Sequence, residues 1–217
     1  MVYKYENLNL ERYMSCFWAK FQLIEEHLFR FDTRIYLTNI IEPKEDDLCV
    51  GAIVGKNPGS AKQSASSNEL QAIKLDGDKL LPTVRNIITS AYSKAQIIPP
   101  DQAYIQVLNL FYLCNPNLAC ALETINNIGD VKPCSSEFKS FPWIWYVWGD
   151  SSSRLSPYKK RFSCLDSPNH FFFDNQVKEV KCLPPSLNEF AKHTQGLKHE
   201  YVIPYIANLI KKALRRF

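Results

Sequence analysis

Short apolar runs, separated by polar turns that contain Gly, Pro or Asn, recur through most of the chain. A run of about four to eight apolar or β-branched residues between such turns is typical of a buried strand. The pattern predicts extended segments at residues 34–41, 48–55, 103–113, 141–149 and 169–185. The run LCVGAIVG is the clearest of these, and we expect its strand to end at Gly55.

Apolar residues spaced three and four apart predict helices between several of these runs. The helical segments are expected at residues 10–31, 80–95, 115–129, 151–165 and 200–217. Asn115 or Asn117 is a candidate N-cap for the helix that Gly129 ends. The polar stretch at residues 62–78 is expected to be an exposed loop.

Strands and helices therefore alternate along most of the chain. This alternation favours a three-layer α/β domain, in which helices flank a central, mostly parallel sheet of four strands. We expect a single domain over residues 1–217, with residues 1–45 as an N-terminal elaboration. Ligands of such sheets bind outside the carboxyl ends of the strands. Three predicted strands end in the turns GKNPGSA, LNLFY and WGDSSSR, so these turns are expected to form one site.

Composition changes this picture little. The chain has 217 residues, 46% of them apolar, which suits one compact domain. Its net charge of +4 permits a polyanionic partner without demanding one. The cysteine count of seven is odd and includes no CxxC pair, which favours reduced thiols and a cytoplasmic location. We expect no metal site, no membrane span and no signal peptide.

Two amides stand at predicted strand ends. Pro58 holds Asn57 out of the helical region, so its carboxamide could hold a water, although NPG is also a good turn. Asn109 is unusual in an apolar strand, since Asn is poor in strands. It either bonds nearby loop backbone or faces the edge of an amide-like ligand such as a pyrimidine.

Two further segments could carry chemistry. Asp150 and the serines after it either cap a helix or help to bind a phosphate. The loop HTQGLKH contains His193 and His199, and a histidine there could stabilise a developing anion. The chain contains no phosphate-binding GxxxxGK[ST] loop, no GxGxxG motif and no GxSxG elbow.

In this order, the motifs VGKNPGSA, VLNLF, YVWGDSSS and GLKHEY resemble the uracil-DNA glycosylase superfamily, nearest to its mismatch-specific G-x-N-P-G branch. They are also similar to an uncharacterised bacterial and phage family with NPSTA, NLF and WG motifs. The resemblance covers roughly residues 48–205. The chain departs from the pattern at Lys56, at Glu200 and Tyr201, and in the long loop at residues 62–77.

The resemblance implies a monofunctional DNA N-glycosylase without a cofactor or metal. Such an enzyme acts as a cytoplasmic monomer on a base flipped out of DNA. Asn57 would hold the attacking water, and His199 would stabilise the leaving base. Contacts to the base and its surroundings would come from Gly55, Lys56, Pro58, Gly59, Asn109, Phe111 and Tyr112. Contacts to DNA would come from Ser60, Ser151, Arg154, Lys198 and Tyr201.

Several substrates and roles stay open at this point. The base could be uracil, a mismatched thymine, or a hydroxymethylated or glucosylated cytosine of phage DNA, which would imply antiviral defence. The alternatives are a nucleotide- or nucleic-acid-binding protein without this activity, and an interaction protein with a decayed site. A basic stripe on one face would favour DNA, and its candidate residues are Lys56, Arg154, Lys159, Lys160, Arg161 and Lys198.

Overall fold

The structure is a computed structural model that describes residues 14–59, 67–75, 77–129 and 133–214. Its strands are β1 (Ser15–Ile24), β2 (His27–Ile40), β3 (Cys49–Gly55), β4 (Ser67–Ala72), β5 (Tyr104–Asn109), β6 (Ile144–Tyr146), β7 (His170–Asp174) and β8 (Glu179–Lys181). Its helices are α1 (Leu80–Ala95), α2 (Leu118–Ile128), α3 (Ser156–Arg161) and α4 (Ile203–Leu214). Short 3₁₀ turns are η1 (Ser135–Phe138), η2 (Ser153–Leu155), η3 (Phe162–Cys164) and η4 (His199–Tyr201).

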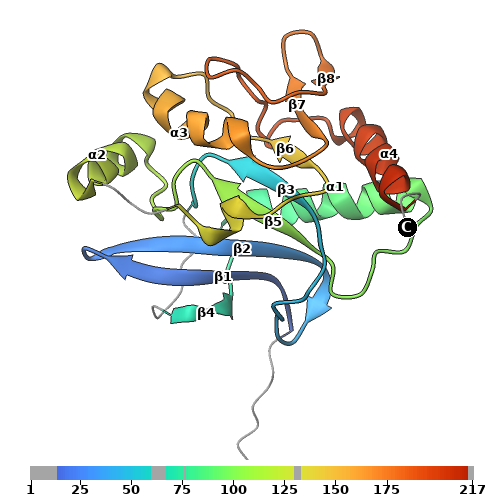
Figure 1. Ribbon diagram of the computed structural model, residues 1–217, viewed down its shortest axis with the longest axis horizontal. Helices are drawn as coiled ribbons and strands as arrows, with labels where there is room; N and C mark the ends of the chain where they lie inside the picture. The colour runs from blue at the N-terminus through green and yellow to red at the C-terminus, as the bar shows by residue number, and fades with distance from the viewer. Residues whose placement is uncertain (1–13, 60–66, 76, 130–132, 215–217) are drawn as a thin grey trace, which may run out of the picture.

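One mixed sheet of eight strands, in the order β4-β1-β2-β5-β3-β6-β7-β8, runs through the described part of the chain (Figure 1). The pairs β4–β1, β1–β2, β2–β5 and β7–β8 are antiparallel, whereas β5–β3, β3–β6 and β6–β7 are parallel. The predicted four-stranded, mostly parallel sheet is therefore wrong. A sheet of β5, β3, β6 and β7 alone would leave the outer backbone groups of β5 and β7 without partners. Here the antiparallel strands β2 and β8 pair with those edges and extend the sheet.

The N-terminal segment accounts for much of this error. Residues 14–31 of the helix predicted at 10–31 instead form β1 and the start of β2, and residues 10–13 lie outside the described part. Glu25 and Glu26 have φ of 47° and 65°, which turns the chain sharply between the two strands. β1 pairs with strands on both sides, and register shifts interrupt its alternation of buried and exposed residues. As a result, the apolar residues of this segment recur at intervals of three and four, the spacing that is typical of a helix.

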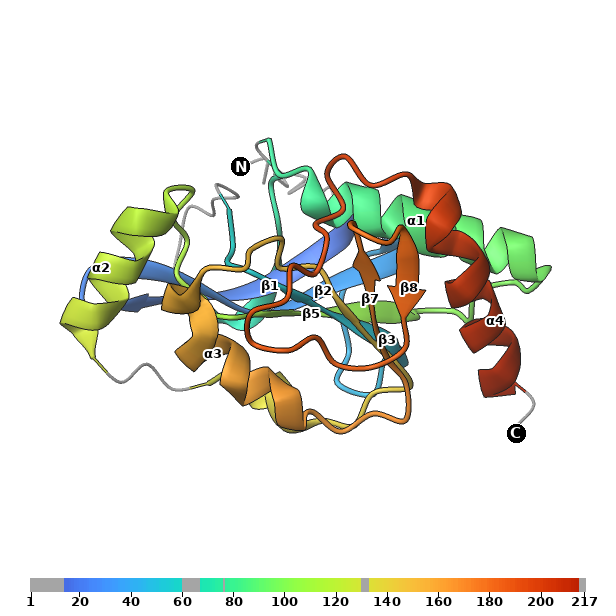
Figure 2. The ribbon, with the colours of Figure 1, turned by 90° about the horizontal axis from the view of Figure 1, so that it is seen from above.

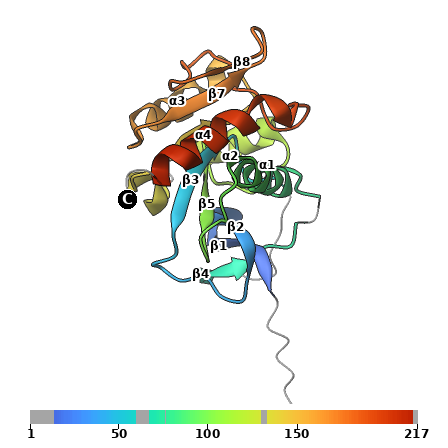
Figure 3. The same ribbon diagram turned by 90° about the vertical axis from the view of Figure 1, so that its right-hand side faces the viewer.

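Helices cover both faces of the sheet (Figure 2). On one face α1 and α4 pack against each other and against a cluster of buried apolar residues (Figure 3). On the other face α2, with residues before and after β6 such as Phe141, Leu155 and Phe162, covers a second cluster, which is rich in aromatic rings. Among the described helices, none combines the length and the apolar character that a membrane crossing would need.

Several local predictions are confirmed. Helix α1 spans the predicted residues 80–95, and the Asn117 side chain caps α2 by accepting from Ala119 N at 2.9 Å and from Cys120 N at 3.2 Å.

Part of the stretch predicted as a loop, residues 62–78, instead forms the edge strand β4, while residues 62–66 lie outside the described part. The sequence SNELQA is mostly polar, with Leu70 and Ala72 as its apolar residues, and its pairing with β1 makes it a strand.

Candidate functional site

The carboxyl ends of β3 and β5 lie side by side, with Gly55 opposite Asn109 in the parallel register. The backbone stays paired beyond both strands, because Leu110 N donates to Gly55 O at 3.1 Å and Phe111 N to Lys56 O at 3.4 Å. The turn that contains Asn57 is therefore held next to the segment that follows Asn109. This is the convergence that the two motifs predicted.

The Asn57 carboxamide is held in one orientation. Its Nδ2 donates to Asn115 O at 2.6 Å and to Pro58 O at 3.2 Å. Because both partners are carbonyl oxygens, the atom facing them has to be the nitrogen. Among the described residues, none donates a hydrogen bond to its Oδ1.

The Asn109 carboxamide is buried, with only 1% of the residue exposed, and its Nδ2 has no partner in the described part of the chain. A Cβ on Gly55 would lie 2.9 Å from Asn109 Oδ1 and 3.6 Å from Leu80 Cδ2. Glycine at position 55 therefore leaves the room in which this amide lies. An unpaired buried donor is costly, and at a strand end it suits a ligand acceptor.

Lys56 and Asp150 join the ends of β3 and β6. Lys56 Nζ lies 3.4 Å from Asp150 Oδ2, and both side chains are partly exposed. Asp150 Oδ1 also accepts from Ser152 N at 2.7 Å, so the carboxylate caps the turn that leads into η2. Lys56 is therefore a cation at the border of the site whose charge is partly offset by Asp150.

His193 is the histidine that lies at this site. A Cβ on Gly149 would lie 2.8 Å from His193 Cβ, and φ of 61° at Gly149 also favours glycine. His193 Nδ1 accepts from Gln195 N at 3.0 Å, so in the neutral ring the proton is on Nε2. Burial, together with the positive charges of Lys56 and Lys192, lowers the pKa of His193, and Asp78 opposes the shift. The ring is thus a neutral donor near Lys56.

A buried ion pair adjoins the same region. Arg30 Nη1 lies 3.3 Å from Asp78 Oδ2, and the two side chains are 1% and 6% exposed. Asp78 Oδ1 also caps α1, accepting from Leu80 N at 2.9 Å and from Leu81 N at 3.3 Å. Because Asp78 already has these partners, it positions α1 beside Gly55 and is a poor candidate for a general base.

Two of the predicted base contacts are enclosed in the core. Phe111 is 4% exposed and its ring centroid lies 5.5 Å from that of Tyr158. Tyr112 is 2% exposed and donates to Glu137 Oε1 at 2.6 Å. Burial and the Glu137 charge raise the pKa of Tyr112 well above its ordinary value. In this arrangement neither ring offers a free face on which a base could stack.

The predicted catalytic His199 begins η4, and its side chain makes no hydrogen bond with a described residue. Tyr201, predicted to contact DNA, lies parallel to Phe173 with ring centroids 5.2 Å apart, so one of its faces is covered. Lys198 is exposed on the same loop.

The other predicted contacts lie apart from one another. Pro58 is buried and Gly59 is partly exposed beside Asn57. Ser151 lines a cavity with residues of β7 and β8, whereas Arg154 lines another between α2 and α3. Ser60 lies outside the described residues.

The candidate basic stripe is only partly available. Lys159 Nζ is buried and donates to Asp150 O at 2.7 Å and to Leu187 O at 2.9 Å. Arg161 Nε donates to Glu137 Oε2 at 2.6 Å. With Lys56 paired to Asp150, the exposed members of the set are Arg154, Lys160 and Lys198.

Sequence reasoning missed the roles of Arg30, Asp78 and His193. Asp78 stands two residues before α1, and an acidic residue at that position is a helix-start signal. Arg30 carried no signal, since it lay in a segment predicted as helix. His193 was singled out with its loop, but no local pattern distinguished it from His199.

No protein-family model, curated protein or solved structure matches this chain. In the described ranges, His, Cys, Asp and Glu side chains form no group of three or more that could hold a metal ion. The site must therefore be interpreted from its own residues.

Proposed function

We propose that this protein is a DNA N-glycosylase, acting on a pyrimidine-like base at the carboxyl ends of β3 and β5. The observation that carries the proposal is the pair of carboxamides there. Within the described residues, Asn57 has a held nitrogen and an oxygen that accepts no hydrogen bond, and Asn109 has a buried nitrogen without an acceptor. The first suits a water, and the second suits a carbonyl oxygen or ring nitrogen of a base.

The reaction would be a hydrolysis of the N-glycosidic bond. As the C1′–N bond breaks, its electron pair goes to the base, and the oxygen of the attacking water bonds to C1′. Asn57 Oδ1 would accept a hydrogen bond from that water and so orient it, but an amide cannot take the proton. The proton would pass to solvent or to the departing base, and catalysis would depend on positioning and on stabilisation of the anion.

Anion stabilisation falls to Asn109 and His193. Asn109 Nδ2 would donate to the base edge, where negative charge develops. His193 Nε2–H would donate to the same anion, the role that the resemblance assigns to His199. The lowered pKa of His193 keeps the ring neutral, so that it donates without giving up its proton.

The proposal includes DNA as partner, a monomer and a cytoplasmic setting. All seven cysteines are free, which suits a reducing compartment. Phage DNA with modified cytosines remains one substrate, with antiviral defence as the role.

A second candidate is a protein that binds a free nucleotide and cleaves nothing. It is favoured by the internal use of Lys56, Lys159 and Arg161, which leaves fewer cations for a DNA backbone. The covered face of Tyr201 also reduces what is available to fill a gap in the DNA stack.

The test is a panel of duplexes and single strands carrying uracil, mismatched thymine or modified cytosine, scored for abasic sites after alkali. Asn57→Ala should lower cleavage about 100-fold, as loss of a positioning group does. Asn109→Leu should abolish cleavage while unfolding no more readily than wild type, because Leu removes a buried amide nitrogen that has no partner among the described residues.

Phe138→Ala, at an exposed ring on η1, is the matched control and should cleave normally. Absence of abasic product on every substrate would reject the glycosylase. Nucleotide binding that Asn109→Leu abolishes would then favour the second candidate.

A further inference from the structure

A cavity of about 480 Å³ lies between the β1–β2 hairpin and the segment that leads from α2 into η1. Volumes of several hundred cubic ångströms are typical of sites for small organic ligands. The described residues that line this cavity come from β1, β2 and β4, from the end of α2 and from the start of η1. None of them contributes to the candidate site at Asn57 and Asn109, so the cavity needs an explanation of its own.

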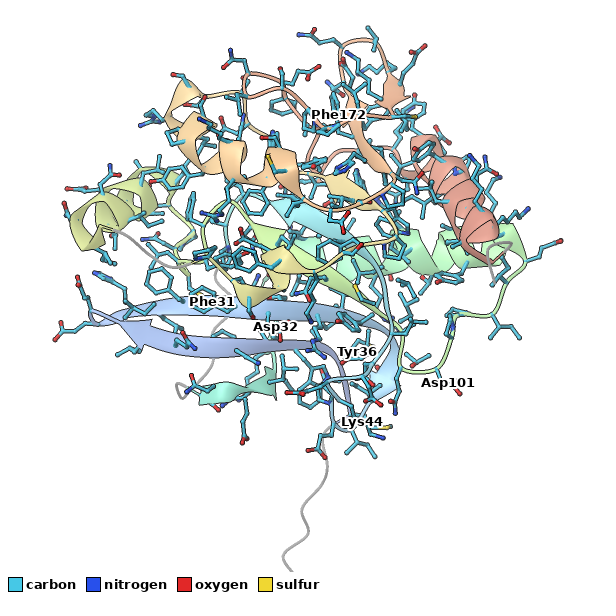
Figure 4. The ribbon with its side chains drawn as sticks, viewed as in Figure 1. Phe31, Asp32, Tyr36, Lys44, Asp101 and Phe172 are labelled. Atoms are coloured by element: carbon cyan, nitrogen blue, oxygen red, sulfur yellow. The ribbon has the colours of Figure 1, made fainter. Side chains whose placement is uncertain are left out.

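A β-bulge in β2 directs Asp32 into this cavity. The register with β1 shifts between Trp18 and Lys20, where two steps along β1 match three along β2. Asp32 lies in the extra length with φ of 44°, a conformation that Asp tolerates better than most residues. Neighbours in a regular strand point to opposite faces, but Phe31 and Asp32, which Figure 4 shows side by side on β2, line the same cavity. The backbone N–H of Asp32 donates to Cys134 Sγ at 3.3 Å, which fixes the bulge against the segment before η1.

The cavity has a net positive charge around Asp32. Asp32 is 6% exposed, and its Oδ2 lies 3.2 Å from Arg34 Nη2 and 3.6 Å from Lys20 Nζ. Two cations therefore share one buried carboxylate. The other carboxylate among the described lining residues, Glu25, follows Lys20 by roughly 16 Å of extended strand, which exceeds the screening length at physiological salt. The excess of positive charge beside Asp32 favours an anionic group.

Lys20 has hydrogen-bonding capacity left for such a group. At 3.6 Å its contact with Asp32 is an ion pair without a hydrogen bond, and no described residue accepts from its Nζ. The Lys20 side chain is 35% exposed, so a ligand can reach the ammonium group. An ammonium group with three donors binds carboxylate or phosphate oxygens as a point charge.

The other walls of the cavity are partly apolar. Ile24, Phe31 and Ile128 provide apolar surface from β1, β2 and the end of α2. On another side Gln22 Nε2 donates to Asn68 Oδ1 at 2.9 Å, which joins β1 and β4 by an amide pair. A ligand that fills this space therefore needs an apolar body next to its anionic group.

We propose that this cavity binds a small organic anion, a carboxylate or a phosphate monoester, with an apolar or aromatic body. The anionic group would accept from Lys20 Nζ, and the body would lie against Phe31 and Ile128. The bulge and the ion pairs of Asp32 hold Lys20 in position before the ligand arrives, which lowers the entropic cost of binding. The proposal does not depend on the function of the site at Asn57.

The test is isothermal titration calorimetry of the full-length protein with four probes. Phenylacetate and phenyl phosphate should both bind, and the one with the higher affinity identifies the anionic group. Phenethylamine has the same ring with a positive charge and should not bind. Acetate should bind about tenfold more weakly than phenylacetate, because it lacks the ring.

Two variants test the residues of the cavity. Lys20→Met should weaken the binding of both anions about 10- to 100-fold without unfolding the protein, because Arg34 still pairs with Asp32. Asn68→Asp keeps an acceptor for Gln22 but adds a negative charge to the cavity wall, so it should weaken the binding of both anions about threefold or more.

Lys94→Met is the matched control, because it removes an exposed cation from α1, on the other face of the sheet, and it should bind both anions as wild type does. Equal affinity for phenylacetate and phenethylamine, or unchanged binding by Lys20→Met, would overturn the proposal. Absence of binding by both anions at about 10 mM would also reject it.

Discussion

The two ends of the central parallel strands differ in chemistry although the same strands form both. At the carboxyl ends of β3 and β5 lie two carboxamides, and His193, Lys56 and Asp150 border them. At the amino end of β3 lies a groove whose lining is almost wholly apolar. The strands between these ends are buried and apolar, so they provide a rigid support that separates the two regions by their own length.

The difference follows from parallel topology. Parallel strands direct all their carboxyl ends to one edge, so polar residues that follow different strands meet there. At the opposite edge the chain arrives from helix ends and Pro-containing segments, and the side chains available are those that extend the core. The polar edge is expected to hold functional groups at some cost in stability, whereas the apolar edge stabilises the fold.

The largest change in stability is expected when the buried ion pair between Arg30 and Asp78, at the polar end, is broken. Asp78→Asn keeps an acceptor for the cap of α1 but leaves the Arg30 charge buried and unpaired, so we expect unfolding to become easier by about 3–5 kcal/mol. Urea denaturation measures the change. In the double variant with Arg30→Met, most of the loss should be recovered. A double variant no more stable than Asp78→Asn would show that the loss does not come from the unpaired charge of Arg30.

At the apolar end the corresponding test is Gly51→Ala in β3. A Cβ there would lie 2.2 Å from Trp143 Cε2, so the ring beneath the groove would have to move, and we expect a loss of about 2–3 kcal/mol. Gly59→Ala is the matched control, because no atom of the described residues lies within 4 Å of the added Cβ, and it should change stability by less than about 0.5 kcal/mol. Equal urea midpoints for the two variants would contradict tight packing at this end.

The smallest change in the free energy of unfolding is expected from the titration of His193. Its pKa lies below 6.5 in the folded protein, chiefly through burial, so the unfolded chain binds more protons between the folded pKa and 6.5. The contribution of His193 to stability is therefore complete above about pH 6.5 and falls as pH decreases through that window. The difference in unfolding free energy between wild type and His193→Gln, measured across pH, isolates it from His170.

Lys56→Met tests the same electrostatic link directly, since removing the Lys56 charge should raise the pKa of His193 in an NMR titration. An unchanged pKa would show that Lys56 does not contribute to the shift, and would leave burial and Lys192 as its causes.

Local sequence patterns predicted correctly those segments whose apolar spacing fits a helix or a strand but not both. The spacing in residues 80–95 is helical and they form α1, and the apolar runs ending at Gly55 and Asn109 form β3 and β5. The predictions failed for segments whose secondary structure depends on hydrogen bonding to another strand. Residues 14–31 have apolar positions compatible with either period, and the polar β4 is a strand only because β1 pairs with it. The eight-stranded mixed sheet could not be inferred from segments taken singly.

For the site, the sequence by itself determined that Gly55, Asn57 and Asn109 stand at strand ends, because strand termination and turn chemistry are local properties. Only the tertiary structure decided that Asn109 Nδ2 has no partner among the described residues and that His193 lies near Lys56. The same holds for Tyr112 and Lys159, whose polar groups bind partners inside the core. Those facts depend on contacts between residues far apart in the chain. The physical reason is that burial and hydrogen bonding are settled when the layers pack, whereas turns are settled within a few residues.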